Sequence, residues 1–532
     1  MSSSESELEK PKGIRWWPAF FIVGLIAVPA WMGYLYFVRA EDRTYQLFVV
    51  NAAVMLTTVL LLVWWLLFSR ARWWQRLFLP AILVGAAIGT LRFDGFTGEM
   101  VPMVSLKWEA AQGALGAGLT PAASSTNSEA VNLSGYVVTD TDWPGYRGSG
   151  RDGIVKNVQF DDSWLTPTEL WRIPVGEGWS SFAAVESYVW TQEQHDAEER
   201  VICREATTGA TIWSHADNAR FEEFLGGPGP RATPTYHDGK LYCLGGTGIL
   251  NCFQAASGEV LWTKDILKEA GASNIEWGMA GSPLVYGETV IVAPGGTNGQ
   301  SVIAFNLIDG EMKWAKGEAR ASYAAPQVFK IQGVDQLLVH QGNGLTAFAP
   351  ADGSELWFHG WSSAQKINVA QPLVYDESAV FLSVGYGRGS ILLDVAKTEG
   401  QWSAEERWRS MRLKSKFNPF VQDGNYVYGL DEAYLVCLDL DTGLRTWKGP
   451  KFGYGQLLRI GNVLLIQAES GELAFVHADP SGFKEIGRFQ AIEGKTWNHP
   501  VVANGRLFVR NGKQAACFQL MDEPGGTVVP AI

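Results

Sequence analysis

The chain has 532 residues, of which 47% are hydrophobic, and it contains 59 glycines and 23 tryptophans. This composition is sufficient for a large core together with membrane segments. The formal net charge of −12 excludes a nucleic-acid partner, because binding phosphates requires a basic surface.

The N-terminal region predicts three transmembrane helices, at about residues 16–38, 45–68 and 74–91. Each stretch is apolar and close to the twenty residues that cross a bilayer. Lysine and arginine side chains near the spans should face the cytoplasm; they are Lys10, Lys12, Arg15, Arg70, Arg72 and Arg76. We therefore expect a multi-pass protein of the cytoplasmic (inner) membrane, with a cytoplasmic N-terminus and a periplasmic, extracytoplasmic remainder.

The composition then changes twice along the chain. Residues 1–98 form the predicted membrane anchor, whose partner is the lipid bilayer. Residues 99–140 are predicted to be a linker, because 110–132 is rich in Ala, Gly, Ser, Thr and Pro and has almost no charge. Residues 141–532 form the predicted extracytoplasmic domain.

The large domain repeats the pattern Gly-x-x-x-Trp, in which a turn glycine precedes an aromatic anchor in a short apolar run. It occurs at 209–213, 258–262, 310–314, 353–357 and 443–447. Degenerate copies at Trp171, Trp408 and Phe489 bring the anchors to eight, spaced roughly 40 to 50 residues apart. Each unit contains about four strand-like runs separated by turn residues. We predict an all-β domain that forms an eight-bladed β-propeller.

The two ends of the repeat array complement each other. Trp171 has no strands of its own before it, whereas the last unit, 499–520, has three predicted strands and no anchor. We expect the strand around Trp171 to pair with the C-terminal strands and close the ring.

A specific resemblance begins with Asp142-Trp143-Pro144, followed by Arg147-Gly148 and Arg151-Asp152-Gly153. Similar phrases occur at 191–194, 229–234, 416–419 and 497–500. With these motifs, residues 141–520 resemble the bacterial PQQ-like (BamB-like) β-propeller repeat proteins, particularly the membrane-anchored members of planctomycete type. The resemblance implies a quinoprotein-like propeller and two functional analogies, the pyrroloquinoline quinone (PQQ) dehydrogenases and the BamB-type assembly lipoproteins.

The dehydrogenase analogy implies a vicinal disulfide, a Ca²⁺ or lanthanide ion and an Asp base. This chain has no adjacent cysteine pair and no Cys-x-x-Cys-His, and its seven histidines lack metal-ligand spacing. We therefore expect no catalytic residues, no metal site and no cofactor, neither PQQ with Ca²⁺ nor another. The five cysteines are predicted to be buried free thiols.

The residues just before the innermost strand of each blade are the candidate site, because these loops meet at the mouth of the central channel. Polar and aromatic side chains at this rim either bind a small molecule or peptide, or plug the channel and satisfy loop backbone; the sequence is compatible with both. The predicted rim consists of Trp179, Arg231, Glu276, Trp277, Tyr323, Gln371, Lys416, Asn418, Tyr454, Gln456, Trp497, Asn498 and His499.

Two functions are compatible with these observations. The first is a membrane-tethered, extracytoplasmic binding or scaffold module without catalysis, which binds a protein or peptide as BamB-type assembly factors do. The alternative is a PQQ- or other cofactor-dependent oxidoreductase with its site at the channel mouth. In either case Arg231 and Lys416 are the expected contacts for an anionic group.

Overall fold

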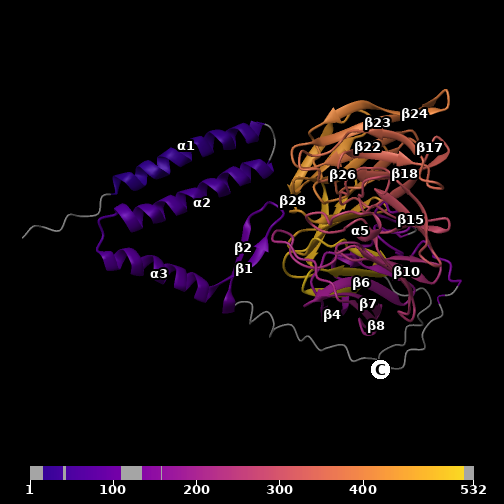
Figure 1. Ribbon diagram of the computed structural model, residues 1–532, viewed down its shortest axis with the longest axis horizontal. Helices are drawn as coiled ribbons and strands as arrows, with labels where there is room; N and C mark the ends of the chain where they lie inside the picture. Colours follow the sequence, from indigo (N-terminus) through magenta and orange to yellow (C-terminus); the bar gives the residue numbers. More distant parts are fainter. Residues whose placement is uncertain (1–15, 40–42, 109–132, 134, 157, 521–532) are drawn as a thin grey trace, which may run out of the picture. The chain divides into compact units, whose positions relative to one another are not determined.

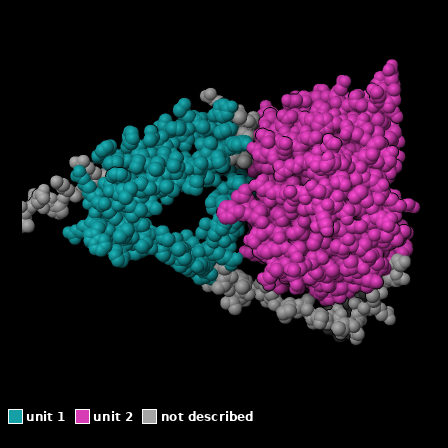
Figure 2. Space-filling view, in the orientation of Figure 1, with its two compact units in different colours: residues 1–118 teal, residues 119–532 magenta. Residues whose placement is uncertain are grey.

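The computed structural model describes residues 16–39, 43–108, 133, 135–156 and 158–520. The chain forms two compact units, Met1–Gly118 and Leu119–Ile532, which Figure 2 shows in different colours. The described part of the first unit is mainly helical, and that of the second is built almost entirely of β-strands (Figure 1).

In its described residues the first unit has three long helices and a β-hairpin; they are α1 (Trp17–Arg39), α2 (Arg43–Phe68), α3 (Trp73–Thr90), β1 (Leu91–Phe96) and β2 (Pro102–Leu106). Two segments of these helices, Trp17–Val38 and Tyr45–Phe68, are long and apolar enough to cross a membrane. Most of their side chains are exposed, as is expected for helices whose surroundings are lipid.

The prediction of three membrane-spanning helices was wrong in number, because only two described helices meet this requirement. Helix α3 does form, but it has only 18 residues and contains Pro80. Its first turn is occupied by Gln75 and Arg76, so the apolar part is too short. Lys10, Lys12 and Arg15 lie outside the described residues.

The hairpin formed by β1 and β2 lies where we predicted the end of the anchor and the start of the linker. The predicted boundary at residue 98 falls in its turn, and β2 lies inside the predicted linker, 99–140. Residues 109–132 of that linker are outside the described part of the chain.

The described part of the second unit has eight blades in chain order, each with four antiparallel strands and one with a fifth strand added, so the predicted eight-bladed propeller is confirmed. Blade 1 contains β5 (Ala183–Val185), β6 (Tyr188–His195), β7 (Glu198–Glu205) and β8 (Thr211–Asp217). Blade 2 contains β9 (Thr235–His237), β10 (Lys240–Leu244), β11 (Ile249–Gln254) and β12 (Val260–Asp265). Blade 3 contains β13 (Leu284–Tyr286), β14 (Thr289–Val292), β15 (Val302–Asn306) and β16 (Met312–Lys316). Blade 4 contains β17 (Gln327–Ile331), β18 (Val334–Gln341), β19 (Gly344–Phe348) and β20 (Glu355–His359).

The second half of the ring follows the same plan. Blade 5 contains β21 (Leu373–Tyr375), β22 (Ala379–Val384), β23 (Gly389–Thr398) and β24 (Gln401–Ser410). Blade 6 contains β25 (Phe420–Asp423), β26 (Tyr426–Asp431), β27 (Tyr434–Asp439) and β28 (Arg445–Lys451). Blade 7 contains β29 (Gln456–Ile460), β30 (Val463–Gln467), β31 (Glu472–His477) and β32 (Glu485–Gln490), with β3 (Ile154–Val155) added parallel to β29. Blade 8 contains β33 (Val501–Ala503), β34 (Arg506–Arg510), β35 (Gln514–Gln519) and β4 (Thr168–Pro174). Two short helices complete the unit, α5 (Ile266–Glu269) and a 3-10 helix (Asp162–Leu165).

The hydrophobic core lies between the blades. Central strands such as β22 and β30 are buried along their whole length, whereas the outermost strand β24 alternates between exposed and half-buried residues. A single four-stranded sheet cannot bury both of its faces, so each blade depends on its neighbours for a core.

Blade 8 closes the ring as predicted, because β4 pairs antiparallel with the C-terminal strand β35. A buried polar cluster strengthens this junction. Arg510 of β34 donates hydrogen bonds to the Gln192 and Gly176 carbonyl oxygens, at 3.1 Å each. Burial raises the pKa of the Glu193 carboxyl, but a hydrogen bond from His195 and the charges of Arg510 and Arg204 outweigh it and lower that pKa to about 2.

The repeated glycine and tryptophan meet between neighbouring blades, not within one repeat. The Trp213 indole of blade 1 lies against Gly258 of blade 2 and donates its Nε1–H to the Ala255 carbonyl oxygen at 3.0 Å. The ring of Trp262 packs in the same way on Gly310, Trp314 on Gly353, Trp408 on Gly443 and, at the closure, Trp171 on Gly209. Among the described residues the pattern therefore connects neighbouring blades at these five junctions.

We predict that Gly258→Ala weakens the propeller more than Gly333→Ala does. Both glycines have a left-handed φ, 75° and 76°, which costs a non-glycine residue about 1 kcal/mol. An added Cβ at Gly333 meets open space, whereas at Gly258 it would lie 2.5 Å from the Trp213 ring. We expect Gly258→Ala to lower the free energy of unfolding by roughly 2 kcal/mol more than the control, as measured by denaturant unfolding. Equal losses of unfolding free energy in the two variants would contradict a role for the contact between Gly258 and Trp213 in joining the blades.

Candidate functional site

The segment between residues 141 and 155 runs along the inner strands of the propeller. Trp143 pairs with Ala184 of β5 through two backbone hydrogen bonds of 2.7 and 2.8 Å, and the Tyr236 N–H of β9 donates to the Pro144 carbonyl oxygen at 2.7 Å. Strand β3 at its end pairs with β29. This lead-in segment therefore contacts blades 1, 2 and 7 through its backbone.

Two buried arginines of the lead-in segment reach the opposite sides of the ring. Arg147 donates to the Phe420 carbonyl oxygen of blade 6 at 2.6 Å. Arg151 donates to the Ser282 and Pro283 carbonyl oxygens, at 3.0 and 2.9 Å, at the start of blade 3. Burial lowers the pKa of both guanidinium groups, that of Arg151 to about 10. Both remain cations at neutral pH and satisfy carbonyl groups of the inner strands.

Side chains of two further blades complete this arrangement. Gln327 of blade 4 donates to the Gly150 carbonyl oxygen at 3.1 Å, and Asn504 of blade 8 donates to the Asp142 carboxylate at 3.0 Å. A segment with hydrogen bonds to inner strands on all these sides lies across the propeller axis. The lead-in segment therefore fills the central channel. We did not predict this role, although the motif Asp-Trp-Pro-x-x-Arg-Gly-x-x-Arg-Asp-Gly was visible in the sequence.

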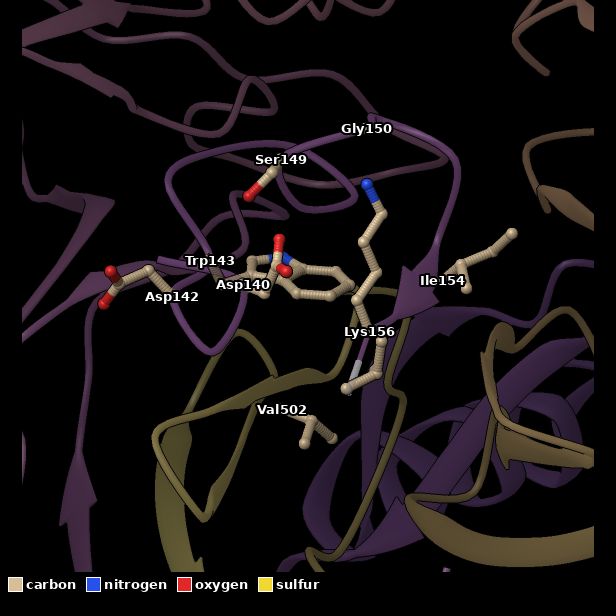
Figure 3. A pocket seen from close by; sticks show the side chains of 9 residues that line it. Asp140, Asp142, Trp143, Ser149, Gly150, Ile154, Lys156 and Val502 are labelled. Atoms are coloured by element: carbon tan, nitrogen blue, oxygen red, sulfur yellow. The ribbon is translucent and has the colours of Figure 1, made fainter. Parts of the chain in front are cut away.

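A small cavity remains beside the lead-in segment (Figure 3). Its lining includes Asp140, Trp143, Lys156 and Val502, and its volume is about 10 Å³. That is room for one water molecule, so this cavity is too small for a substrate or a cofactor.

We predict that Arg151→Ala destabilises the propeller by about 3 kcal/mol, because it removes two hydrogen bonds from a charged donor to buried carbonyl groups. The control is Arg200→Ala, which breaks a half-exposed ion pair with Glu198 and should cost less than about 1 kcal/mol. Chemical denaturation of the two variants measures the difference. Similar midpoints would show that the channel contacts contribute little.

The rim amides link adjacent blades. Each amide group donates to a backbone carbonyl oxygen of a neighbouring loop: Gln371 to Ala325 at 3.4 Å, Asn418 to Gly455, Gln456 to Trp497 at 2.8 Å and Asn498 to Ser180 at 2.7 Å. All four residues are buried. These amides satisfy loop backbone, as one of the two interpretations of the rim expected.

His499 belongs with this buried group. It lies edge-on to the Tyr146 ring of the lead-in segment, with ring centroids 4.9 Å apart. Burial lowers its pKa well below the usual value, and the nearby charge of Arg147 lowers it further. The imidazole is therefore neutral at physiological pH and packs against the segment that fills the channel.

A row of aromatic rings crosses the rim from blade 6 to blade 1. Trp497 lies 4.8 Å from Trp179 and 4.9 Å from Phe417, and Phe417 lies 5.6 Å from Tyr454, all measured between ring centroids. The Lys416 ammonium lies 4.4 Å above the Tyr454 ring. This row, Trp179, Trp497, Phe417 and Tyr454, joins three predicted site residues through one that we had not singled out.

Lys495 lies over the end of this row. Its ammonium group is 4.3 Å from the Trp497 ring and 5.0 Å from the Trp179 ring, distances typical of cation–π contacts. Burial lowers its pKa, while Glu469 opposes this shift. Glu469 also accepts a hydrogen bond from the Trp497 indole at 2.9 Å.

Two predicted residues form a second aromatic pair on the other side of the rim. The Trp277 and Tyr323 rings lie 5.4 Å apart, and the backbone N–H of Trp277 donates to the Tyr323 hydroxyl at 3.4 Å. Glu276 beside them is exposed. Burial raises the pKa of Tyr386, and Tyr323 and Glu276 raise it further. Because Tyr386 also lies 5.4 Å from the Lys416 ammonium, it connects this pair with the aromatic row.

Arg231 is held by its own loop. It donates to the Gly227 carbonyl oxygen at 2.6 Å and to that of Gly229, and it pairs with Glu223 at 3.6 Å. Burial lowers its pKa to about 10, which Glu223 opposes. This guanidinium organises the loop. Of the two cations expected to contact an anionic group, Arg231 is half-buried and Lys416 is buried, and Lys495 nearby is half-buried.

The loop that Arg231 organises also carries Phe224, which is 73% exposed. The Trp179 indole donates to the Gly226 carbonyl oxygen of the same loop at 2.8 Å. Phe224, Phe417, Tyr386 and Lys495 are rim residues that we did not predict. Phe417 and Lys495 lie within two positions of predicted residues, whereas nothing in the local sequence indicated that Phe224 and Tyr386 reach the rim.

The residues present do not form a metal or quinone centre of the kind that the dehydrogenase analogy implied. Within the described part of the chain, no three His, Cys, Asp or Glu side chains are placed to hold a metal ion. All five cysteines are buried and free, which confirms the prediction made for them. The expectation that the protein takes no cofactor stays a prediction.

Comparison with known sequences shows similarity to one family. Residues 197–449 match the family described as outer membrane protein assembly factor BamB. The propeller is similar to the BamB-like PQQ-repeat proteins. The match extends from blade 1 to blade 6. BamB of Shewanella oneidensis is 22% identical over 355 residues, which is 63% of this chain and 86% of that protein.

Solved structures show the same fold. Quinohemoprotein alcohol dehydrogenase from Comamonas testosteroni is similar with a TM-score of 0.52 and 11% identity, over 77% of this chain and 86% of that one. BamB from Moraxella catarrhalis gives a TM-score of 0.48 and 15% identity, over 66% of this chain and 100% of that one. The likeness to the dehydrogenase, at 11% identity, shows the fold alone, so function has to be argued from the site.

Proposed function

We propose that this BamB-like propeller is a membrane-tethered, extracytoplasmic binding module that holds a protein or peptide partner at the rim and performs no catalysis. The observation that carries the proposal is the row of aromatic rings, of which Trp179, Trp497 and Phe417 are half-buried and Tyr454 is buried, above a channel filled by the lead-in segment. A ligand at this rim would therefore contact aromatic rings and would not enter an open channel. This arrangement favours binding to the surface of a partner.

The composition of the rim favours a protein or peptide. Trp179, Trp277, Tyr323 and Trp497 are all half-buried, and tryptophan and tyrosine are enriched among the residues that dominate protein interfaces. Phe224 adds an exposed apolar side chain on a loop held by Trp179 and Arg231. Because the rings are fixed by contacts with one another, little side-chain entropy is lost on binding.

The relatives agree with this reading at the level of the family. The Shewanella oneidensis relative is an outer membrane protein assembly factor, and a role in holding other proteins is consistent with that name.

The side of the membrane on which the propeller lies is part of the same proposal. The two apolar helices return the chain to the side on which it began, so an extracytoplasmic propeller requires that the N-terminus lies on the same, outer side.

The binding proposal is tested with a displayed library of random peptides, selected on the full chain in lipid nanodiscs. We expect enriched peptides whose affinity falls at least about tenfold in Phe224→Ala and in Trp277→Ala. The matched control is Ile308→Ala, since Ile308 is also 73% exposed but lies in an outer turn of blade 3. It should leave the affinity unchanged.

Two results would count against this function. Peptides that bind all three variants equally would move the binding surface away from the rim. A saturable thermal stabilisation by PQQ with Ca²⁺, lost in Lys416→Ala, would instead support the alternative of a cofactor-dependent oxidoreductase; a ligand at a hundred times its Kd adds about 2.7 kcal/mol.

Sidedness is tested by labelling introduced cysteines in intact cells with a membrane-impermeant maleimide. The five native thiols are buried and should not react. We expect Ile308→Cys in the propeller to be labelled before lysis. Labelling only after lysis would place the propeller in the cytoplasm. Arg72→Cys, between α2 and α3, should also be labelled before lysis, because with two crossing helices it lies on the same side as the propeller; its protection in intact cells would contradict this topology.

A further inference from the structure

Two arginine side chains of blade 5 lie over one tryptophan ring beside the rim. Trp361 is in the loop between β20 and β21, Arg388 is in the turn between β22 and β23, and Arg409 is near the end of β24. The guanidinium carbons of Arg388 and Arg409 lie 3.7 and 5.1 Å from the centroid of the Trp361 ring. Both distances are typical of cation–π contacts, so two cations share one indole.

The indole under these cations is firmly held. Trp361 is 1% exposed and belongs to the hydrophobic core between blades 4 and 5. Its carbonyl oxygen accepts a hydrogen bond from the Nε2 atom of the buried His340 at 2.9 Å. Burial lowers the pKa of His340 to about 4, so this imidazole is neutral at physiological pH. The two guanidinium groups therefore lie on a fixed, buried ring.

Arg388 has hydrogen-bond donors that the protein does not use. A guanidinium group carries five N–H donors. Within the described part of the chain, the Arg388 side chain has no hydrogen-bond or ion-pair partner, and its Nε–H is buried. Burial lowers the pKa of Arg388 and the charge of Arg409 lowers it further, whereas Glu406 opposes the shift. A second carboxylate close to this half-buried cation would stabilise its charge.

Arg409 is only partly neutralised by the protein. Its Nη2 donates to the Glu406 carboxylate at 2.7 Å, and its side chain is 54% exposed. Exposed ion pairs of this kind contribute little to stability. Two guanidinium groups thus have one carboxylate nearby, in a chain whose formal net charge is −12. The local excess of positive charge is suited to one more carboxylate.

The turn that carries Arg388 also belongs to the rim and has an unusual backbone conformation. The Arg388 N–H donates to the Gly385 carbonyl oxygen at 3.2 Å, across a turn in which Tyr386 and Gly387 have φ of 56° and 72°. Hairpin turns of this type favour Asn-Gly, because a left-handed φ is unfavourable for a residue with a large side chain. The Tyr386 ring lies 5.4 Å from the Lys416 ammonium. Such strain is common at binding sites.

We propose that Arg388 and Arg409, over the ring of Trp361, bind a carboxylate side chain, Asp or Glu, of the protein or peptide partner. A guanidinium group that contacts an aromatic ring through its face keeps its N–H edge for a bidentate contact with a carboxylate. Because the indole positions both groups before binding, the cost of ordering them is small.

This inference rests on the proposed function, since the carboxylate belongs to a partner at the rim. It adds the chemical character of one partner residue and the place where that residue binds. It also moves the expected anion contact to blade 5, because Arg231 is held by its own loop and Lys416 is buried.

Two displayed peptide libraries test the proposal on the full chain in lipid nanodiscs. The libraries have the same length and the same random positions, but the central residue is glutamate in one and glutamine in the other. We expect the unmodified chain to recover the glutamate library about tenfold more strongly, because a hydrogen-bonded ion pair replaces a neutral contact. Arg388→Gln and Arg409→Gln should each reduce this preference several-fold.

Arg407→Gln is the matched control. Arg407 lies on the same strand, β24, and its guanidinium already pairs with Asp394 at 2.6 Å. Removing its charge should leave the preference for glutamate unchanged. Arg388→Lys keeps the charge but loses the planar fork, so it should retain only part of the preference. Thermal unfolding of all four variants checks that the propeller is folded.

Each other outcome contradicts the proposal. Equal recovery of the two libraries, with binding still lost in Trp277→Ala, would overturn the carboxylate site and leave the proposed function intact. A preference for glutamate that persists in both arginine variants would place the anion contact elsewhere. Thermal stabilisation by inorganic phosphate that is lost in Arg388→Gln, without a preference for glutamate, would assign the cations to a free anion. No binders from either library would overturn this inference together with the proposed function.

Discussion

The contact between an indole of one blade and a turn glycine of the next is the interaction on which the propeller depends. A glycine is required because the turn has a left-handed φ and because the ring lies where a Cβ would be, as at Gly258 beneath Trp213. The indole Nε1–H also satisfies a carbonyl group of the same turn. Each contact therefore packs a large ring against the next blade, and at Trp171, Trp213, Trp262 and Trp408 the indole also donates a hydrogen bond there. None of these contacts can form within a single blade. At the closure the same contact joins Trp171, from the beginning of the propeller, to Gly209 of blade 1.

At the centre of the ring, inner strands converge and bring carbonyl groups that require hydrogen-bond donors. The lead-in segment and the rim amides supply them. Arg147 and Arg151 reach opposite sides of the channel, and Asn498 and Gln456 link neighbouring loops. Polar side chains near the axis are consequently engaged in holding the ring together. Three rings of the aromatic row and one cation remain partly exposed, namely Trp179, Phe417, Trp497 and Lys495. This division is why the proposed partner is one that binds a surface.

Much of the architecture could be predicted from residue patterns. The spacing of glycine and tryptophan predicted eight blades, and the incomplete first and last units predicted that β4 would pair with β35. The prediction of a third membrane span was wrong. The run of apolar residues after Arg76 resembles a span, but helix α3 has only 18 residues. The rim was predicted as one set of equivalent positions. The structure separates it into amides that bond to backbone and rings that contact one another, and residue type alone indicated both possibilities for each position.

The sequence by itself determined the repeat, the number of blades, the closure and the apolar helices, because these follow from local patterns that recur or extend along the chain. Only the tertiary structure decided that the lead-in segment fills the channel, that Tyr386 and Phe224 reach the rim, and that Arg388 and Arg409 share the ring of Trp361. Contacts of this kind join residues that are far apart in sequence, such as Arg147 with Phe420. Their formation depends on the curvature of the closed ring, which no local pattern records.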